Sequence, residues 1–166
     1  MRRPDLVDVW VFGLGPVGPE VLLLRRAPRR VLAGLWQGVS GLIEPGETIV
    51  EAARRELSEE TAIEGDAIEA FYHLDYVAEF VWAPSDALVT SAHFAARVRP
   101  GVEPVLSEEH DAARWASIDE ALAVAVWPGY REAVARIRDN LLDPERAPWF
   151  EIDRYTDPRR PTRRRA

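Results

Sequence analysis

The segment from Gly41 to Ile63, GLIEPGETIVEAARRELSEETAI, constrains the fold of this chain more than any other stretch. It contains a turn sequence, Pro45-Gly46, and then Thr48 followed three residues later by Glu51, which is the pattern of a capping box. Residues with good helix propensity continue to about Thr61. The sequence therefore predicts a loop that leads directly into a capped helix.

The predicted helix carries three glutamates close together. Glu56, Glu59 and Glu60 stand at i, i+3 and i+4, so they spread over an arc of roughly 100°. Their mutual repulsion favours a bound cation, and Mg²⁺ typically takes one or two carboxylates together with substrate phosphates. Arg55, four residues before Glu59, can orient it and also reach Glu47. The alternative explanation is a solvated acidic helix face, which is common on surface helices.

The rest of the chain alternates between strand and helix patterns. Strands are predicted at 6–12, 20–26, 36–43, 68–82, 90–98 and 112–116, and helices at 48–61, 118–124 and 128–142. Gly38 and Gly41 interrupt the third strand, and 68–82 suits one long strand or two short ones. Segments 27–35 and 100–111 are predicted loops. This mixed pattern predicts an α/β (α+β) fold, with a three-layer sandwich as its packing.

Composition narrows the class of protein. The chain has 166 residues, which suits one domain, and it is 47% hydrophobic, which argues against global disorder. The absence of cysteine excludes disulfides, thiolate zinc sites and cysteine nucleophiles. The apolar run after the first residues is too short and too charged for a signal peptide or a membrane span. We therefore expect a cytoplasmic protein that does not bind membranes.

The charge is unevenly distributed. The net charge of −7 argues against a nucleic-acid binder, yet the last ten residues, DPRRPTRRRA, are strongly basic. Three explanations fit this Arg-rich tail: a solvated terminus, a contact with the acidic body or a neighbouring subunit, or a nucleic-acid tether. The body without the tail is even more acidic than the whole chain. If it binds an anionic ligand, metal cations have to mediate the contact.

The segment 41–63 resembles the Nudix box, which reads Gly, five residues, Glu, seven residues, Arg-Glu, an aliphatic residue, any residue, Glu-Glu, any residue, Gly, aliphatic. The matching residues are Gly41, Glu47, Arg55, Glu56, Leu57, Glu59, Glu60 and Ile63. The one departure is Ala62, where the family has Gly. We expect Ala62 to be tolerated at the helix end at a modest conformational cost if its backbone can stay outside the left-handed region.

The resemblance implies a Nudix-type α/β/α sandwich with a mixed central sheet over residues 1–143, and a C-terminal extension with the Arg-rich tail over 144–166. It implies a hydrolase that depends on Mg²⁺ or Mn²⁺ and acts on nucleoside diphosphate derivatives. Dimers are common in the family, so a homodimer is among the expected states. The site residues carried over are Glu56, Glu59, Glu60 and the backbone carbonyl of Gly41 as metal ligands, Arg55, Glu59 and Glu60 for catalysis, and Glu47 as a supporting partner of Arg55.

Two further stretches resemble one branch of the family. Trp36-Gln-Gly-Val-Ser-Gly41, and Glu109-His110 followed by Trp115, are similar to the bacterial dATP/dihydroneopterin triphosphate pyrophosphohydrolases. By this resemblance Glu109 supplies another metal ligand or the general base, and the alternative is a solvated loop residue. We expect His110 to be a structural loop residue.

Three residues outside the box are candidates for binding substrate. Arg25 and Arg26 end a predicted strand near the expected substrate mouth and suit phosphate recognition, unless they are surface charges. Trp36 suits stacking on a base, and the alternative is a core aromatic.

The resulting prediction is attack of metal-activated water on a nucleoside triphosphate, giving a monophosphate and pyrophosphate. Hydrolysis of a dinucleoside polyphosphate, a nucleotide sugar or an oxidised nucleotide is the alternative within the family. A nucleotide-sensing domain without catalysis is the alternative of another class, and the retention of every box carboxylate favours the enzyme.

Overall fold

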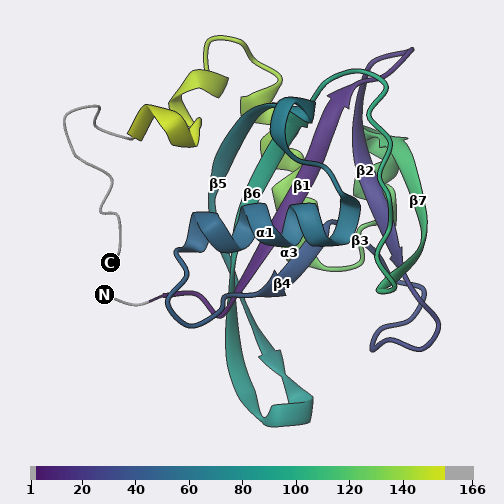
Figure 1. The fold of residues 1–166 in the computed structure, drawn as a ribbon, viewed down its shortest axis with the longest axis vertical. Coiled ribbons are helices and arrows are strands. Elements are labelled where there is room, and N and C mark those ends of the chain that lie inside the picture. The colour runs from purple at the N-terminus through teal and green to yellow at the C-terminus, as the bar shows by residue number, and fades with distance from the viewer. Residues whose placement is uncertain (1–2, 156–166) are drawn as a thin grey trace.

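Seven strands form one mixed sheet in the computed structural model, which describes residues 3–155 (Figure 1). The main path runs β3-β2-β1-β6-β5, while β4 pairs with β1 and β7 pairs with β2. The strands are β1 (Leu6–Leu14), β2 (Pro19–Arg26), β3 (Trp36–Gln37), β4 (Val39–Leu42), β5 (Ile68–Trp82), β6 (Ala87–Val98) and β7 (His110–Ser117). The helices are α1 (Ile49–Thr61), α2 (Ile118–Val124) and α3 (Pro128–Arg136). The Arg-rich tail lies outside the described residues.

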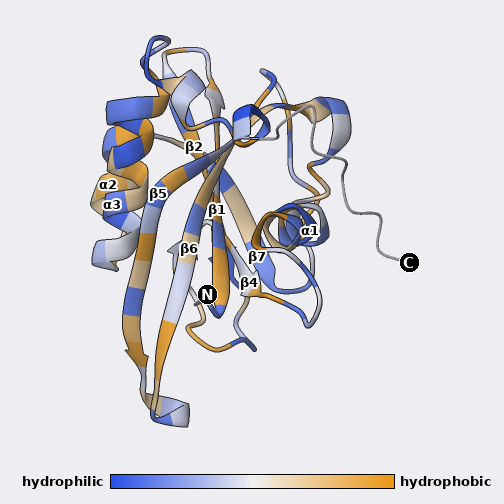
Figure 2. Ribbon diagram, turned by 90° about the vertical axis from the view of Figure 1, so that its left-hand side faces the viewer, coloured by the Kyte–Doolittle hydropathy of each residue, from blue (hydrophilic) through white to orange (hydrophobic). Residues whose placement is uncertain are grey.

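Helices cover both faces of this sheet. Alternate residues of β1 point to opposite faces: Val9 packs in the core under α1, while Trp10 packs in the core under α2 and α3. Figure 2 shows α1 on one side of the sheet and the α2–α3 pair on the other. The predicted α+β sandwich with a mixed central sheet is confirmed. In the described part of the chain, no helix is long and apolar enough to cross a membrane.

Strand β1 organises the sheet around the predicted site. It pairs in parallel with β6 and antiparallel with β2 and β4. Its first residues, Leu6 to Val9, have β4 on one side and β6 on the other. Gly41 lies opposite Val7 on β4, so the first residue of the box is built into the sheet. Because Gly41 is held in the sheet, the loop that leads into α1 starts from a fixed position.

The single interrupted strand predicted at 36–43 is in fact two strands with different partners. Trp36–Gln37 pairs with β2, whereas Val39–Leu42 pairs with β1. The change of partner occurs at Gly38, where a Cβ would lie 2.8 Å from the carbonyl oxygen of Val9 and 3.1 Å from the Trp10 ring. Gly41, in contrast, does not interrupt β4. Only Gly38 acts as the predicted break.

Helix α1 begins and ends where the sequence predicted, but the residue that follows it has a left-handed conformation. The Thr48 hydroxyl accepts from Glu51 N and the Glu51 carboxylate accepts from Thr48 N, which completes the capping box. At the other end Ala62 adopts φ 55° and ψ 17°, and its N–H donates to Ser58 O at 2.8 Å. The condition under which we expected only a modest cost for Ala62 is therefore not met. Helices commonly end in this conformation, usually with glycine.

Ala62→Gly is expected to stabilise the protein by about 0.5–1 kcal/mol, because glycine adopts positive φ without the steric cost paid by alanine. Part of that gain is offset by the greater entropy of glycine in the unfolded chain. Urea denaturation measures the change. The control is Ala123→Gly on the exposed side of α2, where loss of about 1 kcal/mol is expected. Equal destabilisation by both substitutions would contradict the role assigned to the left-handed conformation.

The C-terminal half differs from the prediction mainly in element length. The segment 68–82 is one strand with a register shift between His73 and Val77, and its hairpin with β6 projects beyond the sheet (Figure 1). The predicted helix 128–142 is α-helical to Arg136 and ends in a π-helical turn, Ile137–Leu141. Two 3₁₀ turns follow, Ala147–Trp149 and Ile152–Tyr155.

Candidate metal and phosphate site

Gly41 and Glu56 are in direct contact. The Glu56 carboxyl group lies against the Cα of Gly41, so that a Cβ at this position would be 1.9 Å from the Glu56 carboxyl carbon. Only a residue without a side chain leaves this space to the carboxylate. The Glu56 side chain is 13% exposed, and burial raises its pKa despite its ion pair with Arg55. The first glycine of the box thus serves to admit a carboxylate from α1.

Arg55 joins the loop before α1 to the helix. Its guanidinium donates to both carboxylate oxygens of Glu47, at 2.8 and 3.1 Å, and to Leu42 O at 2.9 Å. It also donates to Glu56 at 2.7 Å and to Glu59 at 3.1 Å. These bonds hold the pKa of Glu47 below its usual value. The structure thus brings Arg55 and the predicted supporting residue Glu47 together.

Glu60 is the most deeply buried carboxylate of the box. Its side chain is 5% exposed, and Oε1 accepts a long hydrogen bond of 3.4 Å from Ser40 N on β4. Oε2 faces His110 Nδ1 at 3.6 Å and has no hydrogen-bond partner among residues 3–155. Burial, and then repulsion by Glu56 and Glu109, raises the pKa of Glu60 to about 9. A carboxylate in this position needs a cation or a proton.

Glu109 and Arg26 complete the cluster from the other side. Glu109 precedes β7, and its carboxylate lies 3.7 Å from the Arg26 guanidinium at the end of β2. Its charge contributes to the raised pKa of both Glu56 and Glu60, which places it near them. Glu109 therefore lies beside Arg26 and near enough to Glu56 and Glu60 for its charge to act on both.

The backbone explains how a residue so distant in sequence reaches α1. Val105 N donates to Thr61 O at 2.8 Å and Ser107 N donates to Glu60 O at 3.2 Å. These two bonds satisfy carbonyl groups at the C-terminal end of α1, which have no partner within the helix. Ala27 N donates to Glu109 O at 2.9 Å, which joins the same segment to β2. Glu109 and His110 are thus fixed between a helix end and a strand end.

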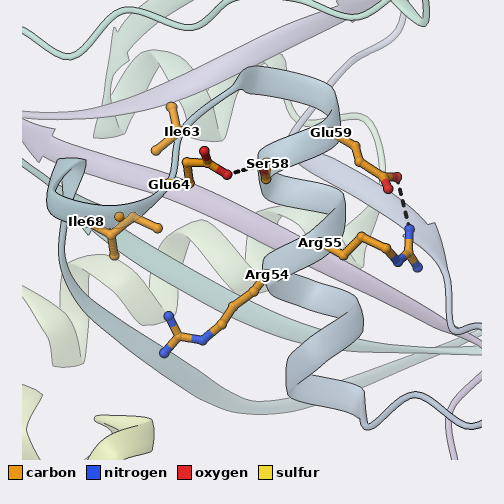
Figure 3. A pocket seen from close by; sticks show the side chains of 8 residues that line it. Arg54, Arg55, Ser58, Glu59, Ile63, Glu64 and Ile68 are labelled. Carbon is orange, nitrogen blue, oxygen red and sulfur yellow. Dashed lines mark hydrogen bonds and ion pairs between the residues drawn. The ribbon is translucent and has the colours of Figure 1, made fainter.

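Glu59 lies apart from the buried carboxylates. Its side chain is 60% exposed and is directed to Arg55 (Figure 3). It borders a hollow of about 450 Å³ beside α1, which is lined neither by Glu56 nor by Glu60. The lining residues are Arg54, Arg55, Ser58, Glu59, Ile63, Glu64, Gly65 and Ile68. The structure therefore separates the predicted ligand set into two buried members and one exposed member.

The three residues predicted to bind substrate also fall into two groups. Arg26 lies beside Glu109, within the acidic cluster. Arg25 is held by Asp111 through two hydrogen bonds of 2.7 and 3.1 Å and stacks over Trp36 at 5.7 Å. Arg114 covers the same indole ring at 4.8 Å. Trp36 and Arg25 thus form a separate stacked group, and Arg26 is the arginine that stands by the carboxylates.

The donor atoms present suit a divalent cation, although no three acidic or histidine side chains within residues 3–155 already surround a common point. Arg55 engages the oxygens of Glu56 and Glu59 in this arrangement. Glu60 Oε2 is buried without a partner, and the glycine at position 41 leaves room for the Glu56 carboxylate. Hard oxygen donors of this kind are those that Mg²⁺ and Mn²⁺ prefer. Glu56 and Glu60, with the Gly41 carbonyl, would hold such an ion.

Sequence reasoning missed two residues beside the cluster. His110, expected to be a structural loop residue, has a fully buried side chain directed at Glu60, and burial with the nearby Arg26 lowers its pKa to about 4. Tyr130 of α3 was given no role by the sequence. Burial, and then the charge of Asp8, raises the pKa of its hydroxyl, and the charge of Glu60 adds to this. The only indication in the sequence that either residue lies at the site was that His110 is adjacent to Glu109.

Comparison with known proteins agrees with this geometry. The NUDIX domain model matches residues 4–137. An octanoyltransferase of Myxococcus xanthus is 38% identical over 72% of this chain, but the match spans only 33% of that protein. The oxidized purine nucleoside triphosphate hydrolase of Mus musculus is 31% identical over 66% of this chain and 67% of its own length.

A solved structure gives the same result. The dihydroneopterin triphosphate pyrophosphohydrolase of E. coli superposes with a TM-score of 0.68 at 26% identity, over 81% of this chain and 94% of that one. The seven strands of the sheet and α1, which carries the box glutamates, all lie within residues 4–137, the range that the family model matches. The chain therefore belongs to the Nudix hydrolase family.

Proposed function

We propose that this chain hydrolyses a nucleoside triphosphate, or another nucleoside diphosphate derivative, at a pyrophosphate linkage and in the presence of Mg²⁺ or Mn²⁺. The observation that carries the proposal is the buried Glu56 against Gly41 and the buried Glu60, both repelled by the charge of Glu109, which lies beside Arg26. An acidic cluster next to an arginine suits a polyphosphate that arrives with cations. The names of two relatives, a triphosphate hydrolase and a triphosphate pyrophosphohydrolase, support a triphosphate.

Each residue has a distinct part in this proposal. A bound divalent ion would neutralise phosphate charge and make its bound water more acidic. Glu56 and Glu60 would hold such an ion, and Arg26 would contact a phosphate oxygen. Glu109, Glu59 or Glu60 accepts the proton of the attacking water. The oxygen of that water bonds to phosphorus as the anhydride P–O bond breaks. For a triphosphate the products are a monophosphate and pyrophosphate. Arg55 keeps Glu56 and Glu59 oriented and is braced by Glu47.

A panel of nucleotides tests the proposal. It includes nucleoside and dihydroneopterin triphosphates, oxidised nucleotides, dinucleoside polyphosphates and nucleotide sugars, each with Mg²⁺, Mn²⁺ or EDTA. We expect release of pyrophosphate from at least one triphosphate with metal and none with EDTA. Release of another phosphate product would instead assign one of the other Nudix substrate classes. Tight nucleotide binding without hydrolysis across the panel would favour a sensing domain, which the retained carboxylates argue against.

A further inference from the structure

We propose that His110 is a positioning residue for Glu60, and that in the metal-bound protein its Nδ1–H donates a hydrogen bond to Glu60 Oε2. This inference rests on the proposed metal-dependent function, because it concerns how one of its ligands is held. It assigns a role to a residue that lies outside the box. Glu60 would then be fixed from two sides, by Ser40 N on β4 and by the imidazole at the start of β7.

The contact between the two side chains is the first support. His110 Nδ1 lies 3.6 Å from Glu60 Oε2, and the side chains are 0% and 5% exposed. Within residues 3–155 neither imidazole nitrogen nor Glu60 Oε2 has a hydrogen-bond partner. Buried polar atoms without partners are rare and costly, so two that face each other indicate an interaction that is completed in another state of the site.

The backbone around His110 is the second support. Arg26 lies opposite His110 after a register shift in the β2–β7 ladder, and His110 N donates to Ser107 O at 3.3 Å. Ser107 N in turn donates to the carbonyl of Glu60 itself, at 3.2 Å. Two main-chain hydrogen bonds through Ser107 therefore connect His110 with Glu60. The main chain thus holds the position of His110 relative to Glu60.

The alternatives are less consistent with the geometry. A metal ligand would direct a nitrogen toward the open side of the cluster, whereas Nδ1 faces Oε2 and the ring is fully buried. If this position had a purely structural role, an apolar side chain would fill it better. Burying an imidazole whose two nitrogens have no hydrogen-bond partner within residues 3–155 costs free energy. Carboxylates that bind metal are usually held by a hydrogen bond from an outer residue, and loss of that bond typically lowers metal affinity about 10–100-fold.

The test measures metal binding to the full chain without substrate. Mn²⁺ affinity is followed by electron paramagnetic resonance for the wild type, His110→Leu and His110→Asn. The leucine removes every ring nitrogen, whereas the asparagine amide can place an N–H where Nδ1 lies. We expect leucine to weaken Mn²⁺ binding roughly 10–100-fold and asparagine to restore most of it. The matched control is His73→Leu on β5, which lies against Phe150 and Tyr155 and should bind Mn²⁺ like the wild type.

A second measurement decides the matter if His110→Leu does not fold. In the wild type saturated with Mg²⁺, ¹⁵N NMR of the imidazoles should show the proton of His110 on Nδ1. An unprotonated Nδ1 there, or unchanged Mn²⁺ affinity in a folded His110→Leu, overturns the proposal. Metal binding without hydrolysis of any nucleotide would refute the proposed function alone. Absence of Mn²⁺ binding in the wild type would refute both.

Discussion

Glu60→Gln is expected to lower turnover of the best nucleotide substrate by about 10³-fold, with the fold retained. Glutamine keeps the shape of the side chain but offers a neutral oxygen to the cation, and it cannot accept a proton from water. Glu59→Gln should also lower turnover by orders of magnitude, because Glu59 is one of the candidates for the general base in the proposed function. Steady-state release of pyrophosphate measures both effects. Near wild-type turnover in both variants would refute the assignment of the site.

The same substitution should make the metal-free protein lose less stability as pH rises. In the folded state burial raises the pKa of Glu60 to about 9 from its ordinary value of 4.5, so the folded chain holds this proton more tightly than the unfolded chain. That contribution is complete below the unfolded pKa and is lost as pH rises toward the folded pKa. In EDTA we expect wild-type stability to fall from about pH 4.5 to 9 and the stability of Glu60→Gln to fall less. Parallel pH profiles would contradict this account.

Gly41→Ala is the second substitution with a large expected effect. The new Cβ would lie 1.9 Å from the Glu56 carboxyl carbon and about as close to both of its oxygens, so the carboxylate must move. Because it is the end of a flexible side chain, the fold should tolerate the movement at a cost of about 1 kcal/mol or less. Mn²⁺ affinity and turnover should nevertheless fall by at least about 10-fold, since the ligand is displaced.

Two comparisons show whether Glu56 transmits the effect of Gly41→Ala. Gly18→Ala is the matched control, because a Cβ there meets no heavy atom within 4 Å, and it should leave both quantities unchanged. The double variant Gly41→Ala/Glu56→Gln should bind Mn²⁺ no worse than Glu56→Gln alone, because residues in contact are not additive. Additive losses would show that the alanine acts on something other than Glu56.

Features that depend on neighbouring residues could be predicted from the sequence. The capping box of Thr48 with Glu51 formed as expected, and the structure has a second one, Ser117 with Glu120, because each joins residues three positions apart. Strand β2 was also located within a residue of its observed bounds. Its strong apolar run decides its conformation without reference to a partner. The pattern of elements predicted the three-layer sandwich, and the family resemblance added the mixed central sheet.

Features that depend on distant segments could not be predicted. Gly38 marks a change of strand partner, which depends on β1 and β2 rather than on the local sequence. The spacing of the three glutamates placed them on one arc, but only the position of α1 on the sheet shows that Glu60 is buried while Glu59 is exposed. His110 meets Glu60 through a fold that joins residues fifty positions apart, so its direction had no local signal.

The hydrogen bonds from Val105 and Ser107 to the end of α1 divide the segment after β6 into two parts with different tolerance of length change. Residues 100–104 connect a strand to this attachment, and insertion or deletion there alters only the path taken. From Val105 to His110, one added residue would rotate Glu109 away from the cluster and break the registration with β2. We therefore expect this chain to keep its site after an insertion in this segment only when the extra residues precede Val105.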